Sequence, residues 1–208
     1  MIKSASEIRS AARATLSGHW AEAAMLTFVY CIVAWAFSAL VGGLEYVQQG
    51  LGTIATLLML PLSWGYTITF LSNARGEDDP FNVSRIFDGY KDFGRIFITI
   101  LLMQVYTFLW TLLFIIPGII KSLSYAMTPF VLRDNPEMKN NEAIELSMKM
   151  MDGHKGDLLW LYLTFIGWGI LCIFTFGIGY FWFAPYVQAS TAQFYEEVKA
   201  DYELKRER

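Results

Sequence analysis

The feature that most constrains this chain is the length of its uncharged apolar runs. Five runs contain no Asp, Glu, Lys or Arg: residues 23–44, 46–74, 96–120, 122–132 and 158–195. A helix that crosses the hydrocarbon core of a bilayer needs about 20 apolar residues, whereas buried strands and most core helices are shorter. Only 17% of the residues are charged, against about a quarter in a typical soluble domain. We therefore expect an all-α membrane protein.

The positions of positive charge decide how often the chain crosses, because Lys and Arg concentrate in cytoplasmic segments. All Lys and Arg residues except Lys121 fall in four clusters: Lys3, Arg9 and Arg13; Arg75, Arg85, Lys91 and Arg95; Arg133, Lys139, Lys149 and Lys155; Lys199, Lys205, Arg206 and Arg208. Two crossings between successive clusters place all four on the cytoplasmic side. Residues 96–132 and 158–195 are each long enough for two crossings.

Six transmembrane helices arranged as three hairpins satisfy this charge pattern, with both termini in the cytoplasm. The predicted spans are residues 22–42, 53–73, 95–112, 115–133, 157–174 and 178–196. Residues 1–208 then form a single membrane domain. Its repeat-like units cover residues 4–73, 79–133 and 137–196, and a cytoplasmic tail covers 197–208.

A short amphipathic segment that ends in a glycine and a ring-bearing residue precedes each hairpin. The three pairs are Gly18-His19, Gly89-Tyr90 and Gly153-His154. We expect these segments to be short cytoplasmic helices in the inner membrane interface, with their apolar faces towards lipid. The glycine permits the change of direction into the membrane. The alternative is that they are linker helices packed on one another.

Lys121, between the runs 96–120 and 122–132, is the only cation that remains inside the predicted membrane region. At 1.5 Å per residue it lies about 18 Å from Arg133, which places it in the outer half of the bilayer. An ionisable residue inside a membrane is a functional-site hypothesis, and Glu45, the only acid assigned to the outer side, is the candidate partner for an intramembrane charge pair. The alternative is that the ammonium of Lys121 reaches the outer headgroups without a partner.

Signatures of catalysis and of metal binding are missing from the sequence. It contains no P-loop, HExxH motif or nucleophile elbow, so we do not expect an enzyme. His19 and His154 lack the cysteine or carboxylate spacing of a metal site, so we expect interfacial rings at helix starts, with no metal and no cofactor. Positive and negative charges are interleaved, which argues against nucleic acid as a partner.

Two classes of function remain open. The first is a membrane scaffold or accessory subunit that contacts membrane lipids and other membrane or cytoplasmic proteins. The second is a small-solute transporter or channel with a polar path near Lys121, a class in which internal repeats are common.

Several stretches of the sequence are similar to a known family. They are SASEIRSAARATLSGHW near the start, the region from IPGIIKSLSYAMTPFVLRDNP through NEAI to GHK in the middle, and TFGIGYFWFAPYVQASTAQFYEEV near the end. In these stretches the chain resembles the bacterial integral membrane proteins catalogued as domain of unknown function 975. The resemblance implies a bacterial cytoplasmic (inner) membrane location and about six spans. It implies no activity and assigns no functional residues.

Overall fold

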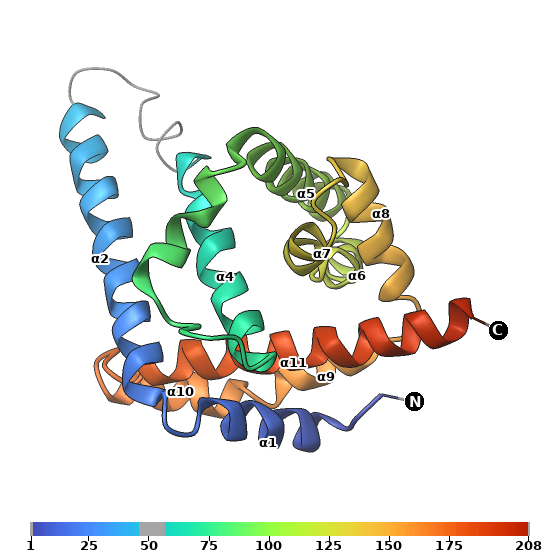
Figure 1. The fold of residues 1–208 in the computed structure, drawn as a ribbon. Coiled ribbons are helices and arrows are strands. Elements are labelled where there is room, and N and C mark those ends of the chain that lie inside the picture. The colour runs from blue at the N-terminus through green and yellow to red at the C-terminus, as the bar shows by residue number, and fades with distance from the viewer. Residues whose placement is uncertain (1, 46–56, 208) are drawn as a thin grey trace.

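The computed structural model describes residues 2–45 and 57–207, and for residue 38 and residues 40–45 the backbone alone. Within these ranges every regular element is a helix (Figure 1). The elements are α1 (Ala5–Leu16), α2 (Trp20–Glu45), α4 (Leu60–Ala74), the 3₁₀ helix η1 (Val83–Tyr90), α5 (Phe93–Leu113), α6 (Ile115–Tyr125), α7 (Thr128–Asp134), α8 (Asn141–Met150), α9 (Lys155–Leu163), α10 (Ile166–Phe174) and α11 (Tyr180–Arg206). The two termini lie on the same side of the molecule (Figure 1).

Four helical stretches in the described residues are long and apolar enough to cross a membrane. They are Trp20–Phe37, Phe93–Leu113, Ile115–Asp134 and Lys155–Phe174. They coincide with the first, third, fourth and fifth predicted spans. The span predicted at 178–196 corresponds to the first half of α11, which becomes charged from Glu196 onwards. The span predicted at 53–73 overlaps α4, which is 15 residues long, and its residues 53–56 lie outside the described residues.

Two of the predicted spans are interrupted. The span predicted at 115–133 consists of α6 and α7, separated just before Pro129, whose ring removes a backbone donor. The span predicted at 157–174 consists of α9 and α10, which are separated at Thr164 and Phe165. The predicted tail, in contrast, continues α11 as far as Arg206.

Nearly all side chains of helix α4 are buried, which shows that this helix lies at the centre of the fold. It runs beside α2 (Figure 1), with the rings of Tyr30 and Tyr66 stacked at 4.6 Å and the hydroxyl of Tyr66 2.9 Å from that of Thr27. The indole of Trp64 donates to the carbonyl of Pro129 at 2.8 Å, which joins α4 to α7. Helix α11 packs on both α2 and α4.

Glycines bring the backbones of α4 and η1 into direct contact. A Cβ atom on Gly65 would lie 2.0 Å from the carbonyl oxygen of Ile86, and one on Gly89 would lie 2.2 Å from that of Pro61. Such distances are far below van der Waals contact, so only glycine fits at either position. The role of Gly89 is therefore close packing. Positive φ angles occur instead at Gly18 (+90°) and Gly153 (+84°).

The amphipathic segments do not all lie as predicted. The apolar face of α1, which consists of Ile8, Ala12 and Leu16, is at most 1% exposed, and α1 packs against α11 and α4. Ile144 of α8 is also buried, and this helix packs on α5, α6 and α7. The expectation that these two faces meet lipid is wrong, because an apolar stripe is satisfied equally well by protein.

The second segment differs from the other two. It forms a 3₁₀ helix, and Val83, Phe87 and Tyr90 on its surface are exposed while Ile86 is buried. The rings of Tyr90 and Phe93 are stacked at 6.2 Å, and Phe93 is in turn stacked on Phe97 at 5.0 Å. Exposed aromatic rings of this kind are typical of a membrane interface.

Large apolar side chains are most exposed where successive helices turn back. Around the α5–α6 turn, Leu112, Leu113, Phe114, Ile115 and Ile116 are 62–72% exposed. Around the α10–α11 turn, Ile173, Phe174, Phe176 and Ile178 are 63–97% exposed. Contiguous apolar surfaces of this extent are typical of contact with a membrane or with another protein.

Candidate functional site

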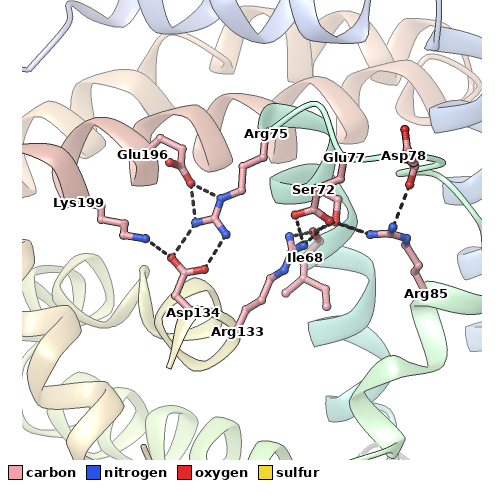
Figure 2. A network of polar contacts seen from close by, with 10 residues as sticks. All are labelled: Ile68, Ser72, Arg75, Glu77, Asp78, Arg85, Arg133, Asp134, Glu196 and Lys199. Atoms are coloured by element: carbon pink, nitrogen blue, oxygen red, sulfur yellow. Dashed lines mark hydrogen bonds and ion pairs between the residues drawn. The ribbon is translucent and has the colours of Figure 1, made fainter. Parts of the chain in front are cut away.

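Charged side chains gather where the ends of α4 and α7 meet the middle of α11 (Figure 2). At the centre of this group, Asp134 accepts two hydrogen bonds from Arg75, each 2.7 Å long. It also accepts hydrogen bonds from Lys199 at 2.7 Å and from the hydroxyl of Tyr195 at 2.8 Å. The Asp134 side chain is only 8% exposed, so these donors, rather than water, stabilise its negative charge.

Arg75 joins all three helices. It is the C-cap residue of α4, and besides Asp134 of α7 its guanidinium contacts Glu196 of α11 at 2.8 Å. A planar guanidinium can bond one carboxylate through two parallel N–H groups and still reach a second carboxylate. Lysine could not reproduce this geometry.

A second group of charges adjoins the first and involves the loop after α4 (Figure 2). Arg133 donates to both oxygens of Glu77, at 2.5 and 2.7 Å, and to the carbonyl of Ile68 at 3.0 Å. Arg85 of η1 reaches Glu77 at 3.2 Å and the hydroxyl of Ser72 at 2.7 Å. The chain segments carrying α4, η1 and α7 are thereby cross-linked. We call the two groups together the ionic network: Arg75, Glu77, Arg85, Arg133, Asp134, Glu196 and Lys199.

The environment of Glu77 favours its charged form. Burial alone would raise the pKa of this carboxyl, but the hydrogen bond from Arg85 and the positive charge of Arg133 outweigh burial, so that the pKa is lower than the ordinary 4.5. Glu77 therefore remains ionised at neutral pH.

Arg95 stabilises the same region by another route. Its guanidinium donates to the carbonyls of Leu132 at 3.0 Å and of Asn135 and Met138 at 3.4 Å, and it also pairs with Asp92. Carbonyls in the last turn of a helix lack partners within that helix. Arg95 thus caps the end of α7 at which Asp134 lies.

The two Gly-His pairs adopt related local structures. After each glycine of positive φ, the histidine begins a helix and contacts an acid three residues later: His19 Nδ1 lies 2.7 Å from Glu22, and His154 Nδ1 lies 3.4 Å from Asp157. His154 is almost fully buried, and its Nε2 also lies 3.0 Å from Asp201 of α11. His19 contacts Phe81 at a ring distance of 6.2 Å.

Tyr90, in the matching position of the second segment, has a different role. Its hydroxyl donates to the carbonyl of Leu58 at 2.8 Å. No group of three His, Cys, Asp or Glu side chains is placed to hold a metal ion in residues 2–45 and 57–207. Cys31 and Cys172 are partly buried free thiols.

Lys121 lies against an aromatic ring and a thioether. Its ammonium is 5.1 Å from the centre of the Trp110 ring and 4.0 Å from the sulfur of Met148. The side chain of Glu45 lies outside the described residues, so the Lys121–Glu45 pair stays a prediction. Met148 belongs to α8, a helix that we expected on the cytoplasmic side. Because α8 packs along α5 and α6 rather than lying apart from them, the side chain of Met148 reaches Lys121.

The ionic network has no signature in the sequence. Its bonded partners are up to 121 residues apart, as in the Arg75–Glu196 pair, and no local motif connects them. One signal was available: Arg133 and Asp134, like Arg75 and Glu77, lie next to predicted span ends, where charges of opposite sign tend to pair.

Comparison with known proteins places the chain in a family. The family described as "Protein of unknown function (DUF975)" matches residues 1–124 and 112–202. The chain belongs to DUF975. Searches of curated proteins and of solved structures gave no match. The resemblance predicted from the sequence is therefore confirmed.

Beside the ionic network a polar cleft of about 650 Å³ opens between α7, α8 and α11. Asp134, Tyr195 and Lys199 lie on one wall, and Glu142, Glu145 and Lys149 of α8 lie on another. Side chains of both signs reach the cleft, so its surface offers hydrogen-bond donors and acceptors to a polar partner.

Proposed function

We propose that this DUF975 protein is a non-catalytic membrane scaffold whose helices are fixed to one another by the ionic network. The observation that carries the proposal is the position of Arg75, which bonds Asp134 of α7 and Glu196 of α11 from the end of α4. Removing one partner from a buried ion pair leaves an uncompensated charge, so such a junction resists separation of the helices that carry it.

In this proposal the chain crosses the membrane six times, as three hairpins with both termini and the ionic network on the cytoplasmic side. Four of the six crossings rest on the helices that are long and apolar enough to span. The remaining two are α4, which carries no charge between Leu60 and Ala74, and the uncharged first part of α11 between Tyr180 and Tyr195. The sidedness rests on the distribution of Lys and Arg.

The proposed scaffold presents the polar cleft to a cytoplasmic partner. Glu142, Glu145 and Lys149 lie on α8, whose apolar face is held against α5, α6 and α7, so the helix can present these polar groups without moving. A helix that is already held in place loses less conformational entropy when a partner binds, which favours a preformed docking surface.

A transporter is the second class, and the network argues against it. Alternating access requires one group of helices to rock against another around a substrate site. Here the ion pairs between α4, α7 and α11 resist movement of these three helices relative to one another. The described contacts of Lys121 are with Trp110 and Met148, neither of which carries a charge that would coordinate an ion.

The test measures how many conformations the helix tips adopt. Spin labels at Ile116 and Ile178, both exposed at helix turns, would report their separation in sealed proteoliposomes by pulsed electron paramagnetic resonance. A scaffold predicts one distance distribution that is unaffected by pH or by sodium and potassium gradients. Two populations whose ratio changes with an imposed gradient would overturn the scaffold proposal and favour the transporter.

A further inference from the structure

An apolar groove lies at the junction of α1 and α2 with the α10–α11 pair. It has a volume of about 270 Å³. Its apolar wall includes Trp20 at the start of α2, Trp168 and Leu171 of α10, and Trp182 of α11. The groove is continuous with the exposed apolar surface, because Trp168, Leu171 and Trp182 are each more than half exposed.

The one charged side chain on this wall is Arg13, in the last turn of α1. Arg13 is exposed, and across the described ranges 2–45 and 57–207 it makes no hydrogen bond or ion pair. The next acid along the chain is Glu22, whose carboxylate contacts His19. The groove thus combines an apolar trough with a cation that is available at one edge.

We infer that this groove binds one anionic phospholipid, with the phosphate on Arg13 and part of an acyl chain along Trp168, Leu171 and Trp182. A guanidinium offers a fork of donors that fits a phosphate, and basic pockets between membrane helices bind anionic headgroups. Indole rings are suited to the boundary between headgroups and chains. The inference depends on membrane embedding but on neither the scaffold role nor the six-crossing topology. None of these residues belongs to the ionic network, and Arg13 lines the same groove as Thr175 and Gly179 of the α10–α11 turn.

The wall of the groove is held in place before any lipid arrives. The rings of Trp20 and Tyr186 lie 6.2 Å apart, and Tyr186 is in edge contact with Phe165 at 5.2 Å. Gly179 allows the α10–α11 turn to close, since a Cβ there would lie 2.9 Å from the Thr175 hydroxyl and 3.3 Å from the Cys172 sulfur. A preformed wall reduces the entropic cost of ordering one lipid.

The first experiment measures lipid retention by native mass spectrometry. Protein from nanodiscs of equal phosphatidylglycerol and phosphatidylcholine should retain one phosphatidylglycerol molecule in preference to phosphatidylcholine. Arg13→Gln should reduce phosphatidylglycerol retention about fivefold, the effect of one basic residue near an anionic headgroup. The matched control Arg206→Gln removes an exposed cation at the far end of α11 and should leave retention unchanged. Equal retention by wild type and Arg13→Gln would overturn the inference.

A second measurement uses the native thiol of Cys172, which lies in the groove, and does not need an Arg13 variant. In a Cys31→Ala protein, phosphatidylglycerol should slow alkylation of Cys172 by a small maleimide, and phosphatidylcholine at the same concentration should not. Equal protection by both lipids would show an apolar trough without headgroup selectivity. Protection that increases with protein concentration and not with lipid concentration would show that a second copy of the chain covers the groove. Either result would overturn the proposed site.

Discussion

Arg75 and Asp134 face each other across the junction of α4 and α7, joined by two parallel hydrogen bonds of 2.7 Å. Because 59 residues of sequence separate them, this pair closes a large part of the chain into one loop. Lys199 and Tyr195 of α11 also donate hydrogen bonds to this carboxylate. Asp134 of α7 therefore receives donors from the end of α4 and from α11. The following predictions test this junction and the fold around it.

Replacement of Arg75 by methionine should destabilise the protein by about 3 kcal/mol, because it removes one partner of a pair whose carboxylate is buried. The measurement is the free energy of unfolding in mixed detergent micelles. Lys91→Gln is the matched control, since the Lys91–Asp88 pair is as short at 2.7 Å but the lysine is 81% exposed. The control should change stability by less than about 1 kcal/mol. Equal effects of the two substitutions would contradict a structural role for the network.

Protonation of Glu77 should account for part of the loss of folding stability at acidic pH. The pKa of this carboxyl is lower in the folded protein than its ordinary 4.5, so ionised Glu77 stabilises the fold above pH 4.5. That stabilisation should be lost as the pH falls from about 4.5 through the folded-state pKa. Glu77→Gln should lower the melting temperature at pH 7 and make it less dependent on pH in the acid range. If the melting temperature of Glu77→Gln depended on pH in the acid range as strongly as that of the wild type, other carboxyl groups would be responsible for the loss of stability in acid.

Gly89→Ala should prevent correct packing of η1 on α4, because the new methyl group would lie 2.2 Å from the carbonyl oxygen of Pro61. We expect a large loss of monodisperse protein in size-exclusion chromatography. Gly156→Ala provides the control, since no atom lies within 4 Å of the position where its methyl group would be. Within α9 this change should stabilise the protein by about 0.5–1 kcal/mol. Normal yields of Gly89→Ala would mean that η1 does not approach α4 so closely.

Topology can be tested with single cysteines in a protein that lacks Cys31 and Cys172. Cysteines at Ser84 and Asn140 should be shielded from a membrane-impermeant thiol reagent in intact cells, and one at Ile178 should react, because the clusters of Lys and Arg fix the cytoplasmic side. Permeabilised cells control for reactivity. Labelling at Asn140 from outside would exclude six spans, whereas shielding at Ile178 would mean that the α10–α11 turn stops inside the membrane.

Much of the fold follows from local properties of the sequence. The uncharged runs determined that the chain is helical and apolar enough for a membrane, because both properties depend on residues close in sequence. The exact ends of the helices were not predicted from the sequence. A hydropathy pattern does not show the break before Pro129, the separation of α9 from α10, or the length of α4.

Tertiary structure decided which surfaces meet. The apolar stripe of α1 fits a lipid interface and a protein groove equally well, and only the packing of α1 on α11 and α4 buries Ile8, Ala12 and Leu16. The same holds for charge: Arg75, Asp134 and Glu196 are separate span-end residues in the sequence, and only the folded chain brings Arg75 within 2.8 Å of both carboxylates. An ion pair depends on distance in space, and a sequence pattern contains no distance between residues that are far apart in the chain.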